Sequence, residues 1–383
     1  MFGKRRIYLD WAAGVAGNPS SPHEEGRRMK KKLEAARTDI ARLAEVQADD
    51  VIFTSGATES NALAILGYVR ARRLLAGADM PGRSNMHVLY LPSVHASVVE
   101  NVKSLAAEGI TVEALPIRDY RVDIDALANM IRPETVLVSM DAVCGETGVI
   151  WNTREVRQAL DAARGGAAAA RILLHVDASQ APLTEKITRD HFGADLLTFD
   201  ASKVGPLHGC GVLIAHRTIP LAPLYSGGGQ ERGLRPGTES PELAAKFAAA
   251  LSAAAKGREA FRASAERDRA RLVERIIGGI PSVLMNEGRA QAPQIVNLSL
   301  PGRDTDYFVA LLDEAGFAVS TRSACETDSE EGSRVVFALT GDRERARSTL
   351  RISWGPRTRG RDIARFAEAL RRAAAFIDSD TQG

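Results

Sequence analysis

The chain has 383 residues, enough for a large hydrophobic core and for two lobes, although length alone also allows a single domain. Hydrophobic residues make up 45% and charged residues 26%, which argues against a disordered or a membrane protein. The net charge of +2 gives no global attraction to nucleic acid or anionic lipid. Because no apolar run reaches the roughly 18 residues that span a bilayer, and residues 1–10 turn polar too soon for a signal peptide, we expect a cytoplasmic protein.

Apolar runs that end in polar or glycine-containing turns recur through the first two thirds of the chain, as is typical of buried strands. They cover residues 51–56, 87–93, 135–143, 171–179, 196–202 and 211–216. Helical patterns lie between several of them, at 58–77, 97–109 and 125–133. This alternation predicts an α/β fold with a mostly parallel sheet covered on both faces, in which ligands bind at the carboxyl ends of the strands.

The last third begins with an Ala/Arg/Glu-rich helical pattern at 241–279, which predicts a long helix bridging to a second lobe. Apolar runs follow at 294–302, 317–325 and 349–355, and an amphipathic helix is predicted at 361–377. These elements predict a smaller α/β domain after the large one.

The three cysteines, Cys144, Cys210 and Cys325, are widely spaced, which argues against a zinc site or a disulfide framework. Cys210 lies in a strand-like apolar run and is predicted to be a buried small hydrophobe. Cys325 lies instead in a polar stretch, 320–334, where neighbouring carboxylates should keep its thiol protonated. Its position therefore needs a functional explanation.

The segment "TSGATES" (54–60) follows a predicted strand and opens a predicted helix. Backbone N–H groups at such a turn can bind a phosphate, although Ser and Thr there often only cap the helix. Asp177 ends one strand, and Lys203 follows the next strand 26 residues later, so both can face one ligand. A lysine, a buried aspartate and a phosphate cradle are together the minimum set for binding pyridoxal phosphate as a Schiff base.

Two further residues fit this chemistry but also have simpler explanations. His95 follows a strand, where it can stack on a cofactor ring and move protons, or merely cap a helix. Arg351 lies in an apolar run, where it can bind an α-carboxylate with two hydrogen bonds, or merely form an ion pair.

The sequence resembles the cysteine desulfurases, of the class V aminotransferase group of fold-type I pyridoxal phosphate enzymes. The matching stretches follow the family order: "YLDWAA" (8–13), "GNPSSPHEEG" (17–26), "FTSGATESNALAI" (53–65), "HVDASQ" (175–180), "GGGQERGLRPGTES" (227–240), "RSAC" (322–325) and "LRISWG" (350–355). The resemblance implies an aspartate aminotransferase-like fold. A large cofactor-binding domain is predicted at 14–245, and a small domain that carries the cysteine loop at 1–13 and 246–383.

The resemblance implies that five residues contact the pyridoxal part of pyridoxal 5'-phosphate. Lys203 resembles the Schiff-base lysine, Asp177 the partner of the pyridine nitrogen, and Gln180 the donor to the ring hydroxyl. His95 resembles the stacking histidine. Ser202 precedes the lysine where the family usually has histidine, and is a further predicted cofactor contact.

The remaining assignments concern the phosphate, the substrate and the partner subunit. Ala57 and Thr58 match the phosphate cradle, and Arg351 resembles the arginine that binds the substrate carboxylate. Thr238 matches a threonine that the family supplies to the other subunit, which implies a homodimer. Cys325 falls on the nucleophile of the mobile loop.

The implied reaction converts L-cysteine to L-alanine. Lys203 moves protons at the substrate α-carbon, and the thiolate of Cys325 attacks the substrate sulfur and keeps it as a persulfide. The loop then delivers the sulfur to an acceptor, either an iron–sulfur scaffold or a tRNA-thiolation protein. We hypothesise that Cys325 loses its proton only inside the active site, helped by His95 or by the substrate.

Besides Ser202, the sequence departs from the family pattern at several other places. Cys144 and Gly145 replace two asparagines, and a family segment between residues 13 and 17 is missing. Asp200 replaces a phosphate-binding serine; since a carboxylate would repel phosphate, it is predicted to turn away or to bind a backbone amide. These departures keep two alternatives open: a selenocysteine lyase or other class V activity, and a catalytically weakened relative that serves as a scaffold.

Overall fold

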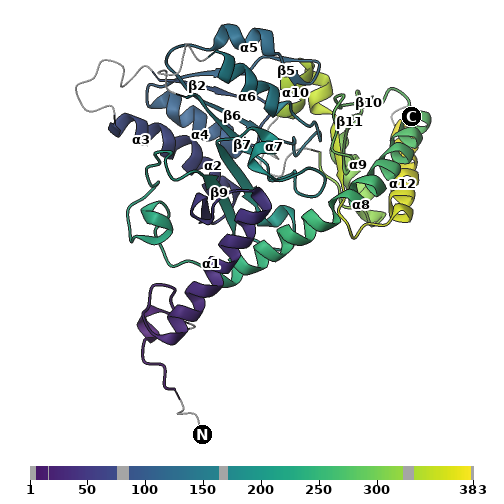
Figure 1. Cartoon of the computed structure of the whole chain (residues 1–383). Helices are drawn as coiled ribbons and strands as arrows, with labels where there is room; N and C mark the ends of the chain where they lie inside the picture. The colour runs from purple at the N-terminus through teal and green to yellow at the C-terminus, as the bar shows by residue number, and fades with distance from the viewer. Residues whose placement is uncertain (1–5, 16, 76–85, 164–170, 322–331, 381–383) are drawn as a thin grey trace.

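The computed structural model describes residues 6–15, 17–75, 86–163, 171–321 and 332–380. Two hydrophobic cores organise these residues, a large one around the central sheet and a smaller one toward the C-terminus. Figure 1 shows the second core's elements, β11, α9 and α12, to one side of the central sheet, and the N-terminal segment reaching away from the rest of the chain.

A seven-stranded sheet in the order β1-β9-β8-β7-β6-β2-β3 crosses the larger core. Its strands are β1 (Val51–Thr54), β2 (His87–Tyr90), β3 (Thr111–Ala114), β6 (Thr135–Asp141), β7 (Leu173–Asp177), β8 (Leu196–Asp200) and β9 (Gly211–Ala215). Neighbours from β8 to β3 run parallel, whereas β9 is antiparallel to both β8 and β1. The predicted strands and the mostly parallel sheet are confirmed. The edge strand β3 was not predicted, because its four residues are exposed or half-buried and form no apolar run.

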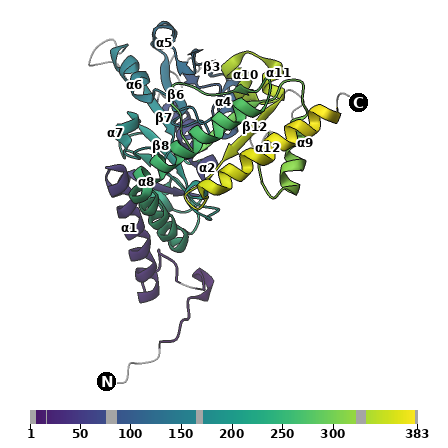
Figure 2. The same ribbon diagram turned by 90° about the vertical axis from the view of Figure 1, so that its right-hand side faces the viewer.

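Helices lie on both sides of this sheet (Figures 1 and 2), as predicted. They are α1 (Glu24–Ala44), α2 (Ala57–Ala62), α3 (Tyr68–Leu75), α4 (Ala96–Ala107), α5 (Ile124–Met130), α6 (Thr153–Ala162) and α7 (Arg189–Phe192). A π-helical turn at Leu63–Gly67 joins α2 to α3 without leaving the helical conformation. A short hairpin, β4 (Ile117–Arg118) and β5 (Arg121–Val122), precedes α5.

The predicted long helix is α8 (Pro241–Gly279), and it joins the two cores. Its first half buries Phe247 and Leu251 in the larger core, and its second half buries Leu272 and Ile276 in the smaller one. Helix α1 packs along α8. A single continuous helix therefore fixes one core relative to the other.

The smaller core contains an antiparallel sheet of β10 (Leu284–Met285), β11 (Ile295–Ser299) and β12 (Thr349–Ser353). The last helices are α9 (Thr305–Glu314), α10 (Arg334–Thr340), α11 (Arg343–Arg347) and α12 (Gly360–Asp380). Helix α12 packs on α8 and α9, which completes the core (Figure 2).

The domain bounds 14–245 and 246–383 stay a prediction. Within the described residues, no helix has the length and apolar character that crossing a membrane requires.

Candidate active site

A cavity of about 350 Å³ opens at the carboxyl ends of β6, β7 and β8, the edge at which ligands were expected. Seven of the predicted site residues line it: Ala57, Thr58, His95, Asp177, Gln180, Lys203 and Arg351. They come from five separate segments of the chain, between residues 57 and 351, and the fold brings them together.

Asp177 ends β7 and is buried. Its Oδ1 accepts the backbone N–H of Ser179 at 3.0 Å, and its Oδ2 accepts the side-chain amide of Asn61 at 2.8 Å. Two hydrogen bonds offset part of the cost of burying the carboxylate. Asn61 lies on α2 and was not predicted from the sequence, where it reads as an ordinary helical residue.

The amide of Asn61 also links Asp177 to His95. Its Nδ2 donates to the Ser97 hydroxyl at 2.9 Å, and that hydroxyl lies 2.8 Å from Nδ1 of His95. His95 caps α4, and its Nδ1 accepts the backbone N–H of Ser97 at 3.2 Å. Because Nδ1 accepts a backbone N–H, we assign the neutral tautomer with the proton on Nε2.

A second carboxyl group, Asp141, ends the neighbouring strand β6 and lies opposite Asp177 in the sheet register. It lines the same cavity, and its buried Oδ1 has no hydrogen-bond partner among the described residues. Burial, and next the charge of Asp177, raise the pKa of Asp141 well above its ordinary value. Asp141 therefore tends toward the neutral acid.

The replaced asparagines have a visible structural consequence. A Cβ atom at Gly145 would lie 3.0 Å from Nε2 of Gln180, so the glycine gives room for the glutamine side chain. Cys144 is buried in the cavity wall, and burial raises the pKa of its thiol to about 12. Cys210 is also buried, as predicted, and burial raises its thiol pKa to about 12. Both thiols are therefore protonated at neutral pH.

Lys203 closes a short 3-10 helix, Ala201–Lys203, that follows β8. Asp200 caps this helix with its Oδ1, which accepts the N–H of Ser202 at 2.8 Å. The other oxygen, Oδ2, accepts the N–H of Ala57 at 2.9 Å. The prediction that Asp200 binds a backbone amide is confirmed, and the amide belongs to the predicted phosphate cradle.

Arg351 lies on β12 and reaches the cavity from the smaller core. Its Nη1 donates to the carbonyl of Gly145 at 3.2 Å, which fixes the guanidinium beside the cavity wall. Arg334, at the start of α10, also lines the cavity and donates to the carbonyl of Val94 at 2.7 Å. Arg351 thus ties the smaller core to the active-site loops, whereas Arg334 adjoins Val335, which is part of the larger core.

Thr238 does not line this cavity. It lies in a smaller hollow of about 120 Å³, together with Cys210 and Arg235. Ser202 contacts Asp200 through its backbone and is not a lining residue either. Cys325 lies outside the described residues.

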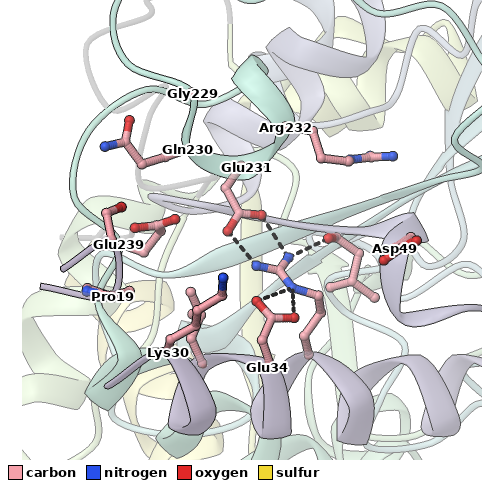
Figure 3. Close-up of a pocket in the computed structure, with 13 residues that line it drawn as sticks. Pro19, Lys30, Glu34, Asp49, Gly229, Gln230, Glu231, Arg232 and Glu239 are labelled. Atoms are coloured by element: carbon pink, nitrogen blue, oxygen red, sulfur yellow. Dashed lines mark hydrogen bonds and ion pairs between the residues drawn. The ribbon is translucent and has the colours of Figure 1, made fainter. Parts of the chain in front are cut away.

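The loop that carries Thr238 is anchored by a buried ion pair, drawn in Figure 3. Arg37 of α1 donates to both carboxylate oxygens of Glu231, at 2.7 and 2.8 Å, and to the carbonyl of Val51 at 2.7 Å. Glu231 also accepts the N–H of Phe53 at 2.9 Å. Since Val51 and Phe53 belong to β1, the ion pair joins the loop to the strand that leads into Ala57.

The model of the class-V aminotransferase family matches residues 6–366 of the chain. The chain belongs to this family. Among its relatives, cysteine desulfurase IscS 1 of Archaeoglobus fulgidus is 33% identical over 357 residues, which cover 92% of the chain and 88% of the relative. The resemblance to class-V cysteine desulfurases, and with it the predicted enzyme class, is confirmed.

Solved structures agree with this class-V assignment. A NifS-like protein superposes with a TM-score of 0.84, covering 94% of the chain and 92% of the neighbour; at 24% identity the likeness shows the fold alone. A structure of SspA in complex with cysteine is 27% identical, with a TM-score of 0.73 and coverage of 91% and 93%. The predicted fold-type I architecture is confirmed.

Class-V enzymes of this group use pyridoxal phosphate, and the cavity fits that cofactor unevenly. The ring end, which we define as Asp177, Asn61, Ser97 and His95, offers a hydrogen-bonded carboxylate and an imidazole. The phosphate end, defined as Ala57, Thr58 and Asp200, offers backbone amides, but a carboxylate already binds one of them. The ring end therefore fits the cofactor as it stands, and the phosphate end fits once Asp200 releases Ala57.

Proposed function

We propose that the chain converts L-cysteine to L-alanine and passes the substrate sulfur to an acceptor protein. The observation that carries this proposal is the convergence of Lys203, Asp177 and Arg351 on one cavity. An amine, a buried carboxylate and a guanidinium are the groups that a pyridoxal phosphate enzyme needs for its cofactor and for an amino acid substrate. The relatedness to cysteine desulfurases supports the choice of substrate.

Pyridoxal phosphate, when bound, supplies an electron sink for carbanion chemistry at the substrate α-carbon. Asp177 would pair with the protonated ring nitrogen, and its hydrogen bonds to Asn61 and Ser179 orient the carboxylate for that purpose. His95 would stack on the ring, with its tautomer held by Ser97. Gln180 would donate its amide to the ring hydroxyl.

Lys203 and Arg351 would handle the substrate. The amine of Lys203 holds the cofactor at rest and then moves a proton at the substrate α-carbon. The guanidinium of Arg351, oriented by the carbonyl of Gly145, would bind the α-carboxylate through its further N–H groups. Substrate orientation would then depend on β12, an element of the smaller core.

The sulfur transfer requires a nucleophilic thiolate, for which we propose Cys325. The raised thiol pKa values of Cys144 and Cys210 support this choice, because a protonated thiol is a poor nucleophile. The thiolate sulfur forms a bond to the substrate sulfur while the carbon–sulfur bond breaks. The electron pair remains with the substrate carbon, which takes up a proton to give alanine, and Cys325 keeps the sulfur as a persulfide.

Incubation with L-cysteine tests the proposal. Wild-type protein should release alanine, and a mass spectrum should show one added sulfur atom on the peptide that contains Cys325. Cys325→Ala should abolish both signals, whereas Cys144→Ala, the matched control in the cavity wall, should keep the persulfide on Cys325. Full alanine turnover by Cys325→Ala would contradict the assigned role.

We further propose that the chain works as a homodimer. The exposed apolar side chains of the N-terminal segment support a second copy as their cover, since Leu9 is 89% and Trp11 69% exposed. The separation of Thr238 from the cavity supports its supply to a partner subunit. Light scattering after gel filtration should give twice the chain mass, and a monomer would contradict the proposal.

The cytoplasmic location and the acceptor, an iron–sulfur scaffold or a tRNA-thiolation protein, stay predictions.

One observation keeps the catalytically weakened scaffold as a second candidate. Asp200 places a carboxylate on the amide of Ala57, where the family binds the cofactor phosphate. Borohydride reduction in the presence of pyridoxal phosphate separates the two candidates. A cofactor adduct on Lys203 supports the enzyme, and its absence supports the scaffold.

A further inference from the structure

The carboxylate of Asp200 bridges two backbone segments at the phosphate end. Oδ2 accepts the N–H of Ala57 at 2.9 Å and Oδ1 accepts the N–H of Ser202 at 2.8 Å, so each oxygen binds one amide. The two amides come from separate segments, one opening α2 and the other preceding Lys203. Asp200 therefore holds the two segments together as a small anion would.

The backbone around these amides is closely packed. A Cβ atom at Gly211 would lie 2.6 Å from the carbonyl carbon of Gly56, so β9 approaches the turn before Ala57 as closely as only glycine allows. A Cβ at Gly56 itself would lie 3.4 Å from Oδ2 of Asp200. The carboxylate thus occupies the space immediately beside the turn, which leaves little room for a second anion there.

The amide of Ala57 favours a negative partner for two reasons. It opens a helix that continues from α2 through the π-helical turn to Leu75, and the first N–H groups of a helix have no acceptor within it. The helix dipole adds a positive potential at the same end. A carboxylate and a phosphate would compete for this amide, and their charges would repel each other at contact distance.

We propose that Asp200 is a built-in competitor of the cofactor phosphate, which lowers the affinity of this chain for pyridoxal phosphate relative to pyridoxal. The inference rests on the proposed assignment of Ala57 and Thr58 to the phosphate. To bind it, Asp200 must release Ala57 and turn away. Pyridoxal lacks the phosphate and requires no such movement, so the selectivity for the phosphorylated cofactor is smaller than a serine at position 200 would give.

Two variants remove the charge in different ways. Asp200→Ser keeps a good helix cap for the segment that ends at Lys203. Asp200→Asn keeps the shape of the side chain, so one variant remains informative if the other does not fold. Asp313→Asn, at an exposed position of α9 in the smaller core, is the matched control for loss of one carboxylate. Circular dichroism of each cofactor-free protein checks the fold.

The measured quantity is the ratio of the dissociation constants of pyridoxal and pyridoxal phosphate, each obtained by absorbance titration of cofactor-free protein. We expect this ratio to rise about 10- to 100-fold in Asp200→Ser and to rise in Asp200→Asn, with no change in Asp313→Asn. The rise should come from tighter binding of pyridoxal phosphate. Alanine formation is not needed for this measurement.

The outcomes separate this inference from the proposed function. An unchanged ratio in both folded variants, with both ligands bound, overturns the competitor role and leaves the cofactor site intact. Weaker binding of pyridoxal phosphate in Asp200→Ser also overturns it, since Asp200 would then support the phosphate. If neither ligand binds to wild type or variant, the cofactor site itself fails, and the inference fails with it.

Discussion

The ring end and the phosphate end of the cavity each have a carboxylate, but these two carboxylates differ in what they leave for the cofactor to bind. At the ring end, Asp177 is held by Asn61 and Ser179 and presents its charge to the cavity. At the phosphate end, the carboxylate of Asp200 accepts hydrogen bonds from the backbone N–H groups of Ala57 and Ser202. One end is ready for a positively charged ring nitrogen, whereas the other already carries an anion where a phosphate should bind.

This difference shows that a chain can keep the residues of a family binding site although that site does not yet have a free place for its ligand. Ala57 and Thr58 match the family cradle and line the cavity, as the sequence predicted. A single carboxylate at the end of β8, that of Asp200, already accepts the backbone N–H of Ala57 in this cradle. The chemistry of a backbone anion site is therefore decided by the side chains packed against it, and these come from distant parts of the sequence.

The largest expected effect concerns the ring end. Asp177→Asn removes the charge that would pair with the ring nitrogen, and we expect alanine formation to fall about 10²- to 10³-fold. Asn61→Ala leaves the carboxylate in place and removes one of its hydrogen bonds, so its loss should be about tenfold. The rate at saturating cysteine and saturating cofactor measures both. Equal losses in the two variants would show that alanine formation depends on the hydrogen bonds around Asp177 rather than on its charge.

The next largest effect concerns the support of the phosphate end. Glu231→Ala leaves Arg37 buried without its main partner, which should cost about 3–5 kcal/mol of stability. The same change should loosen β1, and with it the turn at Ala57. Urea unfolding and the dissociation constant of pyridoxal phosphate measure the two consequences.

Glu34→Ala is the matched control for Glu231→Ala. Glu34 also pairs with Arg37, but its side chain is 48% exposed, so its loss should cost less than about 1 kcal/mol. If the two variants lose similar stability, the anchor is not the buried carboxylate, and the phosphate end does not depend on this ion pair.

The sequence predicted the parts of the site that depend on local pattern. Lys203 and Asp177 follow strands, and parallel strands that end at one edge must bring such residues together. Asn61 and Ser97 were missed because their role depends on which side chain each one faces: Asn61 bonds to a residue 116 positions away. In the sequence, both are ordinary polar residues of a helix start, and only the packing of α2 against α4 joins them.

Asp141 was missed for a related reason, and it provides the smallest predicted effect. Its pKa is raised in the folded chain, mainly by burial, so between its unfolded value of 3.8 and its folded value the folded state binds more protons than the unfolded state. Wild-type stability therefore falls with rising pH across that window. Asp141→Asn cannot ionise, so its stability relative to wild type should grow as the pH rises above 3.8, by at most about 1.4 kcal/mol per pH unit. Urea unfolding at several pH values measures the gap, with Asp313→Asn as the exposed control. A gap that does not change with pH would mean that the fold does not raise the pKa of Asp141, and Asp141 would then be charged opposite Asp177.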